Sequence, residues 1–187
     1  MALTSTPETA TIIIDQQERR NALDVATCEK LAAEFTSAVD DGARAIVLAG
    51  AGPHFCAGVD MRFLQDPELV PALHRLLDVI VTIPVPVIAM VHGAALGAGT
   101  QLAIASDLRV VAPNARFAIT AAKLGLMINH WTVQRLALLA GHGPARSMLL
   151  AAEELDARQP CDWGSPSARA IWRAPRPGRL SWQCWGH

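Results

Sequence analysis

The chain has 187 residues, of which 51% are hydrophobic and 18% charged, which is enough apolar material for one sizeable core. Its formal net charge of −1 and the lack of a long basic run argue against nucleic acid or an anionic membrane as a partner. Small-molecule chemistry is favoured instead. No apolar run reaches the roughly twenty residues that cross a bilayer, and the N-terminus lacks the regions of a signal peptide, so we expect a cytoplasmic protein without a membrane span.

Strand-like and helix-like segments alternate along the chain. The β-branched run TATIIID is typical of a strand, and Asp24 is a suitable N-cap for the helix that follows. The predicted strands span residues 9–15, 43–48, 87–91, 108–112 and 117–119, and the predicted helices span residues 25–39, 68–81, 96–105, 132–139 and 145–152. This alternation predicts an α/β domain in which crossover helices bury a sheet.

The most informative stretch is residues 92–110, HGAALGAGTQLAIASDLRV, where an apolar strand is followed by a glycine-rich turn and a helix. It places Gly97, Ala98 and Gly99 at a helix N-terminus. The first N–H groups of a helix have no internal acceptor and lie at the positive end of its dipole, so they can bind a developing oxyanion or a phosphate. The alternative is a tight strand-to-helix turn that binds no ligand.

The four cysteines, Cys28, Cys56, Cys161 and Cys184, show neither close pairing nor the spacing of metal ligands. We therefore expect free thiols, no disulfide framework and no metal site.

The character of the sequence changes at Pro160. Four of the five tryptophans follow this position, and neither helix nor strand periodicity is found there. We therefore divide the chain into a core of residues 1–159 and an aberrant tail of residues 160–187, which we expect to be poorly ordered. Our hypothesis is that a frameshift replaced the original C-terminus. Sequencing the gene across codon 160 tests it, and an intact frame confirmed by a second read would refute it.

Four segments within residues 9–159 carry a family resemblance: ERRNAL, HFCAGVDM, the run from PVPVIAMV to APNARF, and KLGLMINHWTVQRL. In this order and spacing they resemble the enoyl-CoA hydratase/isomerase superfamily, also called the crotonase family. The resemblance implies an α/β crotonase fold, a ClpP-like spiral of ββα units that binds an acyl-CoA thioester. Coenzyme A then belongs to the substrate or ligand, and no cofactor is bound permanently.

In that family, two backbone N–H groups grip the thioester oxygen as the enolate forms. The matching positions are Val59 in AGVD and Ala98 in GAG, and main-chain donors do not depend on the side chain. Preorganised donors of this kind usually contribute more to catalysis than any other single effect. The resemblance also implies a coenzyme A site lined by Arg19, Arg20, Ala22, Cys56, Ala57, Gly58 and Gly97. The alternative for the arginines is a solvated turn. Cys56 is favoured as a small packed side chain over a nucleophile, because no base accompanies it in the sequence.

The sequence departs from the family at the acid/base pair. Family hydratases use two glutamates, and the matching positions here are Gln101 and Ala121, neither of which can ionise. We therefore expect weak or absent hydratase turnover. In MINHW, bulky residues replace the usual glycine-rich turn and place Asn129, His130 and Trp131 near the acyl end of the site. His130 is a substitute base, or else it caps or packs the helix start, and Trp131 is a wall of the acyl pocket.

Other acidic residues have weaker claims. Asp60 and Asp107 are interpreted as structural, since the family's matching aspartates close a loop and start a strand. Asp66 and Glu68 are the available carboxylates for an isomerase that draws its acid from this loop.

Three functions are consistent with these residues. The first is a protein of lipid metabolism that binds fatty acyl-CoA or enoyl-CoA with little chemistry. The second is an active enoyl-CoA hydratase or isomerase, a lyase of fatty acid β-oxidation if hydratase. The third is a non-functional truncation product: intact family members form homotrimers or hexamers through C-terminal helices that we expect to be missing here, and their loss would expose apolar surface.

Overall fold

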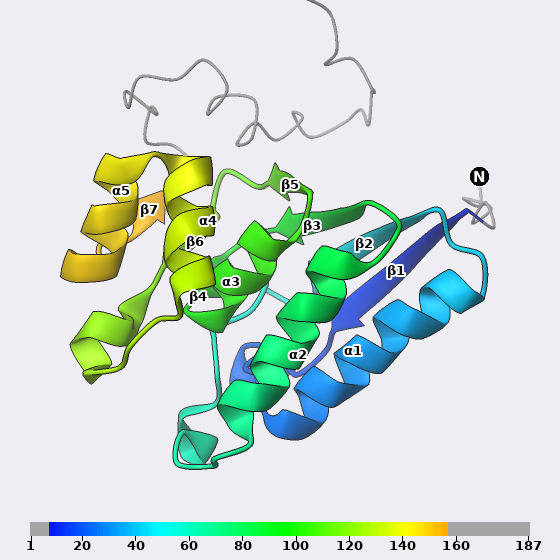
Figure 1. Cartoon of the computed structure of the whole chain (residues 1–187), viewed down its shortest axis with the longest axis horizontal. Coiled ribbons are helices and arrows are strands. Elements are labelled where there is room, and N and C mark those ends of the chain that lie inside the picture. Colours follow the sequence, from blue (N-terminus) through cyan, green and yellow to red (C-terminus); the bar gives the residue numbers. More distant parts are fainter. Residues whose placement is uncertain (1–7, 157–187) are drawn as a thin grey trace, which may run out of the picture.

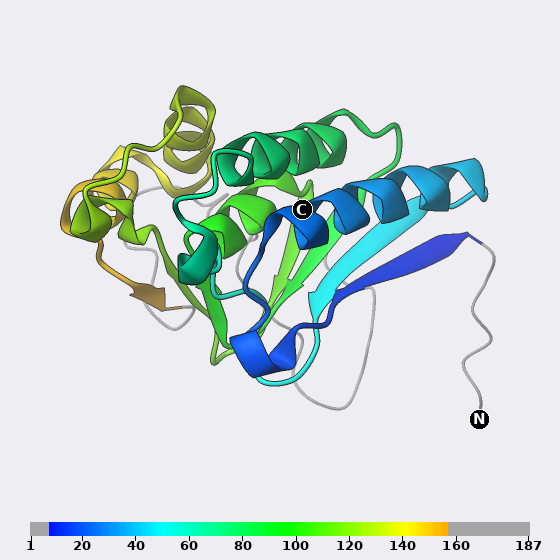
Figure 2. The ribbon, with the colours of Figure 1, turned by 90° about the horizontal axis from the view of Figure 1, so that it is seen from below.

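The computed structural model describes residues 8–156. Its main layer is a parallel four-stranded sheet in the order β1-β2-β3-β5, and three helices cover one face of it (Figures 1 and 2). The strands are β1 (Thr9–Ile14), β2 (Ala45–Gly50), β3 (Val87–Val91) and β5 (Leu108–Val111). The covering helices are α1 (Val25–Asp40), α2 (Leu69–Thr82) and α3 (Ala98–Ala105).

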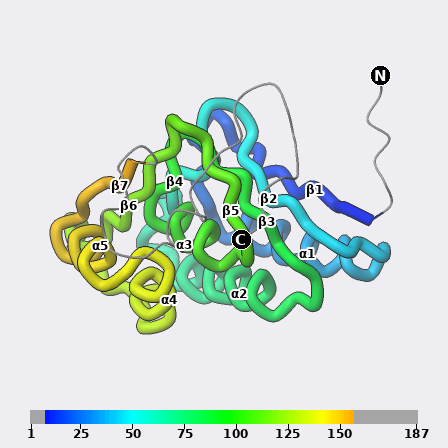
Figure 3. The backbone as a smooth tube through the Cα atoms, turned by 90° about the horizontal axis from the view of Figure 1, so that it is seen from above, coloured from blue at the N-terminus to red at the C-terminus, as the bar shows by residue number. Residues whose placement is uncertain are grey.

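A second, smaller layer lies at one end of this sheet. Figure 3 shows β4 and β6 beside α3, with α4 and α5 beyond them. The sheet has the order β4-β6-β7, with β4 (Ala94–Leu96) parallel to β6 (Arg116–Ala118) and β7 (Leu155–Asp156) antiparallel to β6. The helices are α4 (His130–Ala140) and α5 (His142–Arg146). Short 3-10 turns span Gln17–Arg19, Met61–Phe63 and Thr120–Leu124, and a π-helical turn spans Ser147–Ala151.

The core lies between the main sheet and its helices. Alternate strand residues such as Ile12, Leu48 and Val87 are buried against Phe35 of α1 and Leu76 of α2. Side chains alternate across a strand, so their neighbours face the other side. On that side the sheet carries exposed apolar groups, and Leu108 remains 56% exposed.

Two helix starts are fixed by side-chain caps. The Asp24 carboxylate accepts a hydrogen bond of 2.8 Å from the Thr27 N–H, which confirms the predicted N-cap of α1. The Asn129 side chain accepts one of 3.0 Å from the Thr132 N–H and so begins α4. The alternative that His130 caps this helix is therefore wrong, because Asn129 holds the cap position.

The predicted α/β alternation is confirmed, and its main strands and helices agree with the structure within a few residues. Two short strands, β4 and β7, were not predicted. The predicted helix over residues 145–152 is wrong in its bounds: α5 begins at His142, and a π-helical turn follows it as far as Ala151. The predicted domain boundary at residue 159 and the frameshift hypothesis concern residues outside the described part of the chain.

Candidate functional site

The ERRNAL turn (residues 18–23) and the loop carrying Val59 meet through one parallel bridge. The Leu23 N–H donates to the Gly58 carbonyl at 2.8 Å, and the Asp60 N–H donates to the Leu23 carbonyl at 2.8 Å. In a parallel bridge of this form, the residue between the two partners directs its own N–H and C=O away from the neighbouring segment. The Val59 N–H therefore points away from the ERRNAL turn.

The same loop contacts β4 and the start of α3 on its other side. Cys56 forms a parallel bridge with Ala95: its N–H donates to the Ala94 carbonyl at 3.0 Å, and its carbonyl accepts from the Leu96 N–H at 2.9 Å. Contacts this close require glycine in α3, because a Cβ on Gly99 would lie 2.1 Å from the Cys56 carbonyl oxygen. The loop and the N-terminus of α3 are thus packed backbone to backbone.

Gly58 marks the point of closest approach to Ala98. Its φ is +104°, and a Cβ there would lie 3.0 Å from the Leu96 carbonyl oxygen and 3.8 Å from the Ala98 nitrogen. Gly97 holds the turn before α3 at φ 52°, with its N–H bound to the Ala118 carbonyl at 2.7 Å. The structure therefore brings Gly58, Val59, Gly97 and Ala98, all predicted site residues, to one place.

The backbone N–H groups of Val59 and Ala98 form no hydrogen bond with the described part of the chain. Ala98 is the first residue of α3, so its N–H has no acceptor in the preceding turn of the helix. Within residues 8–156, neither of these two groups donates to a protein acceptor. The Ala98 N–H lies at the positive end of the α3 dipole, where an atom with negative charge is stabilised.

Gln101 is buried, and its orientation is fixed from α4. Its Nε2 donates to Thr132 Oγ1 at 2.8 Å, and Thr132 is wholly buried. Asn129 continues this network, since its side chain also lies 3.0 Å from His74 Nε2 on α2. Gln101 lies three positions after Ala98, so both are on one face of α3, and helical side chains lean toward the N-terminus. The neutral amide is therefore held beside the first turn of α3.

The two remaining acid/base candidates lie in different environments. Ala121 is buried in the 3-10 turn Thr120–Leu124, and its carbonyl accepts a 2.9 Å hydrogen bond from the Leu126 N–H. Its methyl group has no proton to exchange. His130 is the exposed first residue of α4. The structure gives its ring no contact with Gln101, which is bound to Thr132 instead.

Arg19 was predicted to line a coenzyme A site, but its guanidinium is already bound to the protein. Nη1 lies 3.0 Å from both Asp24 Oδ2 and Asp60 Oδ2, and Nη2 donates to Gln16 Oε1 at 2.6 Å. The Arg19 side chain remains 27% exposed, so it is held by these ion pairs and is only partly solvated. Arg20 is exposed and has a left-handed backbone, with φ 54°, and no side chain within residues 8–156 forms an ion pair with it.

The other predicted coenzyme A positions are small and packed. Ala22 is buried, and Ala57 is half-buried with its N–H bound to the Arg20 carbonyl at 3.0 Å. Cys56 is fully buried, and burial raises the pKa of its thiol to about 12. A thiol with so high a pKa is almost wholly protonated at neutral pH, which favours a packing role over a nucleophilic one.

Asn21 is a site residue that the sequence analysis missed. It is fully buried at φ 58°, and its Nδ2 lies 2.8 Å from the Ala51 carbonyl and 2.7 Å from the His54 carbonyl. Its Oδ1 accepts a 2.9 Å bond from the Gln16 N–H. Asn21 thus fixes the start of the loop that later carries Val59. Asparagine tolerates the left-handed backbone, and that tolerance was the available sequence signal.

Two of the remaining acidic candidates, Asp107 and Asp66, accept hydrogen bonds from backbone N–H groups. Asp107 Oδ2 accepts from the Val87 N–H at 2.8 Å at the start of β3, and Asp66 Oδ1 accepts from the Glu68 N–H at 2.9 Å. The structural interpretation of Asp107 agrees with this contact. Asp66 has the geometry of a turn residue, and Glu68 is exposed beside it.

The Asp60 network predicts a pH dependence of stability. The hydrogen bond from the Arg62 guanidinium, with help from Arg19, holds the pKa of Asp60 well below its ordinary 3.8. In Asp24, burial raises the pKa, but hydrogen bonds from Thr27 and Arg19 outweigh it and the net direction is down. Both carboxyls therefore bind protons more readily in the unfolded chain, so their stabilisation is present above pH 3.8 and is lost as the pH falls below it.

Urea unfolding between pH 7 and pH 3 measures this effect. For the unaltered chain, we expect the urea concentration at the unfolding midpoint to fall steeply as the pH approaches 3. We expect Asp60→Asn to be less stable at pH 7 and its midpoint to change less with pH. Parallel profiles for the two proteins would contradict the assignment to Asp60.

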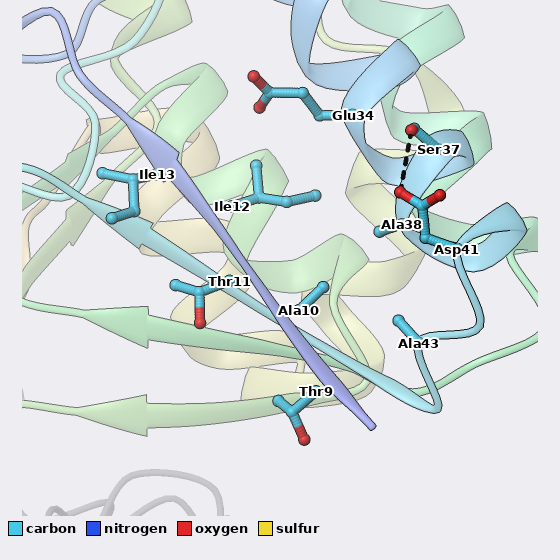
Figure 4. A pocket seen from close by; sticks show the side chains of 10 residues that line it. All are labelled: Thr9, Ala10, Thr11, Ile12, Ile13, Glu34, Ser37, Ala38, Asp41 and Ala43. Atoms are coloured by element: carbon cyan, nitrogen blue, oxygen red, sulfur yellow. Dashed lines mark hydrogen bonds between the residues drawn. The ribbon is translucent and has the colours of Figure 1, made fainter. Parts of the chain in front are cut away.

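Two open hollows lie away from these loops. One, of about 590 Å³, lies between β1 and α1, where Ile12 points toward the helix that carries Glu34 and Ser37, and Ile13 lies on the other side of the strand (Figure 4). The other, of about 670 Å³, runs along α4 and is lined by Trp131, Arg135 and Leu138 among others. Trp131, predicted as a wall of the acyl pocket, therefore faces a hollow that Gln101 does not line. Residues 8–156 hold no group of histidine, cysteine and acidic side chains suited to a metal, and no helix there is long and apolar enough to cross a membrane.

Comparisons with known proteins agree with the fold and the motifs. The family model for enoyl-CoA hydratase/isomerase matches residues 6–169. A protein of Mycobacterium tuberculosis named probable enoyl-CoA hydratase echA6 is 44% identical over 161 residues, covering 84% of this chain and 65% of that protein. The 1,2-epoxyphenylacetyl-CoA isomerase of Escherichia coli is 32% identical over 166 residues, covering 82% and 63% respectively.

A solved enoyl-CoA hydratase of Bacillus anthracis superposes with a TM-score of 0.77 at 28% identity, covering 86% of this chain and 66% of that one. The α/β architecture is therefore that of the crotonase fold. The chain belongs to the enoyl-CoA hydratase/isomerase family. It spans about 65% of the length of the curated relatives with which it shares 44% identity.

Proposed function

We propose that this chain binds fatty acyl-CoA or enoyl-CoA thioesters at the Val59 and Ala98 N–H groups and performs little chemistry on them. The observation that carries the proposal is that both groups lack a protein acceptor within residues 8–156, while their loops are in backbone contact at Gly58. Such donors stay oriented without a ligand, so binding an oxygen costs little reorganisation.

The chemistry follows from what these groups can and cannot do. Two N–H donors polarise the thioester carbonyl and stabilise an enolate if one forms, and the dipole of α3 adds to this effect. Removing or delivering the proton requires an ionisable group, and the amide of Gln101 has none. Its hydrogen bond to Thr132 keeps that amide in place without making it a base. The site can thus hold a thioester, but it lacks the acid/base pair that hydration of a double bond requires.

The coenzyme A portion of the ligand is proposed to lie along the ERRNAL turn. Arg20 offers an exposed cation there, and the half-buried Ala57 donates its N–H to the Arg20 carbonyl, while Ala22 is buried beside them. Arg19 is withdrawn from this set because its guanidinium is bound to Asp24 and Asp60. The ligand brings its own coenzyme A, and no permanent cofactor or metal is proposed. We propose a role in fatty acid metabolism from that ligand, and the cytoplasm as the location of the protein.

An active hydratase or isomerase is the second candidate. It is favoured by the names of the relatives, which include an enoyl-CoA hydratase and a coenzyme A isomerase. His130, exposed at the start of α4, is the side chain proposed as its base. Robust hydration of crotonyl-CoA that is lost in His130→Ala would favour this candidate.

A chain that binds no acyl-CoA by itself is the third candidate. The chain spans about 65% of the length of its 44%-identical relatives. A homotrimer or hexamer is proposed for an intact protein of this type, and a monodisperse trimer of the 187-residue chain in size-exclusion chromatography would count against the third candidate.

One preparation of the 187-residue chain separates the three candidates. We expect calorimetric binding of palmitoyl-CoA and crotonyl-CoA hydration at or near the uncatalysed rate. Binding without turnover supports the proposal, binding with turnover supports the enzyme, and a folded chain that binds no acyl-CoA refutes the first two.

A further inference from the structure

Arg19 joins the two segments that form the Leu23–Val59 bridge. From the ERRNAL turn, its Nη1 donates at 3.0 Å to Asp60, which directly follows Val59, and at 3.0 Å to Asp24, which directly follows Leu23. The Asp60 side chain is only 7% exposed, so this contact is held away from most of the solvent. One guanidinium therefore ties both strands of the bridge together at the same end.

The bridge by itself is a weak constraint on Val59. It consists of two backbone hydrogen bonds to Leu23, and one more backbone bond, from the Ala57 N–H to the Arg20 carbonyl at 3.0 Å, joins the same two segments. Gly58 precedes Val59 with φ +104° and has no side chain to restrict it. Rotation of the peptide between Gly58 and Val59 would redirect the Val59 N–H and would also break the hydrogen bond from the Leu23 N–H to the Gly58 carbonyl. A contact that keeps the two segments of the bridge together therefore also keeps the direction of the Val59 N–H.

The loop has one side-chain clamp at each end. Asn21 binds the carbonyls of Ala51 and His54 before the bridge, and Arg19 binds Asp60 after it. Arg62 also binds Asp60, with Nη2 at 2.7 Å, but it lies two residues further along the same loop and its side chain is 65% exposed. Arg62 stabilises the carboxylate, whereas Arg19 connects it to another segment.

We propose that Arg19 is a positioning residue of the oxyanion site: by holding Asp60 against the ERRNAL turn, it sets the direction of the Val59 N–H toward the oxygen that Ala98 also binds. This inference rests on the proposed thioester site. It gives Arg19 a role through the loop backbone, in place of the contact with coenzyme A that its position in the motif implies.

The test is the carbonyl stretching frequency of palmitoyl-CoA carrying ¹³C at the thioester carbon, measured by isotope-edited infrared spectroscopy on the full chain. Hydrogen bonds from the two N–H groups lower this frequency in the bound ligand. We expect Arg19→Gln to lose about half of the lowering, because one of two donors is misdirected, and to bind about three- to tenfold more weakly. Arg19→Lys keeps the charge but lacks the planar guanidinium group, so its frequency lowering should lie between those of the unaltered chain and Arg19→Gln.

The control is Arg75→Ala, which removes an exposed arginine of α2 and should leave the frequency unchanged. Asp60→Asn should reduce the frequency shift as Arg19→Gln does, and the double variant should lose no more than either one, since the two side chains act through one contact. Circular dichroism confirms the fold of each protein, and Arg19→Lys serves if Arg19→Gln does not fold.

The outcomes separate this inference from the function on which it rests. A lowered frequency in the unaltered chain that persists in both Arg19 variants overturns the role of Arg19 and leaves the thioester site standing. No lowering in the unaltered chain overturns the thioester site, and the role of Arg19 with it.

Discussion

Hydration of crotonyl-CoA should rise by about 100-fold or more when two carboxylates are introduced together as Gln101→Glu and Ala121→Glu, since paired general acid/base groups contribute about 10²–10⁴ in rate. Position 101 is buried beside Thr132, whose hydroxyl can donate to the new carboxylate as it now accepts from the amide. Position 121 is buried in the 3-10 turn Thr120–Leu124. Initial rates on crotonyl-CoA measure the effect.

The matched control is Gln101→Glu with Thr120→Glu, which adds the same charges but places one of them a single residue away on the same turn. Each single variant, and this control, should stay within about tenfold of the unaltered chain, because one acid without its partner completes only half of the proton transfer. Equal gains in the control and in the proposed pair would show that Ala121 does not occupy the second acid position.

Acyl-CoA affinity should fall about tenfold or more in Gly58→Ala, the loss of about one well-formed hydrogen bond. The new methyl group would lie 3.0 Å from the Leu96 carbonyl oxygen, in a backbone at φ +104° that strains any residue with a Cβ. Relief of that contact turns the peptide that carries the Val59 N–H. Calorimetry with palmitoyl-CoA measures the loss.

Gly42→Ala provides the control for this glycine. Its φ of +89° imposes comparable backbone strain, but a Cβ there would meet nothing within 4 Å, and it ends α1 far from the site in sequence. Both variants should lose some stability, and only Gly58→Ala should lose affinity. A Gly58→Ala protein that folds and binds as tightly as Gly42→Ala would contradict the placement of the site.

The main elements were predictable because their signals are local. A cap at Asp24, the β-branched strand β1 and the small residues that begin α3 each act over a few positions. The short strands β4 and β7 were not predictable in this way: β4 has three residues and depends on pairing with Arg116–Ala118, and β7 has two. Whether such short strands form depends on pairing partners that are distant in the sequence. The sequence around them shows no alternation of apolar and polar residues that would predict a strand.

In the site, too, features set by local sequence were predictable, and contacts between distant residues were not. The backbone donors at Val59 and Ala98 follow from the motifs, because a helix N-terminus and a glycine turn are visible in the sequence, and their joint role stays a prediction. The ion pair between Arg19 and Asp60 joins residues 41 positions apart, and the bond between Gln101 and Thr132 joins residues 31 apart. No spacing rule reports such contacts. The sequence motif therefore predicts a ligand-binding role for Arg19, whereas the folded chain pairs its guanidinium with Asp24 and Asp60.

The most direct measurement of the central claim compares palmitoyl-CoA with S-hexadecyl-CoA, a thioether that has the same chain but no carbonyl oxygen. If the Val59 and Ala98 N–H groups hold that oxygen, calorimetry on the 187-residue chain will show the thioester binding about tenfold or more tightly than the thioether. Equal affinities would show that the chain binds the acyl tail and coenzyme A without using these two N–H groups, and would contradict the proposed oxyanion site.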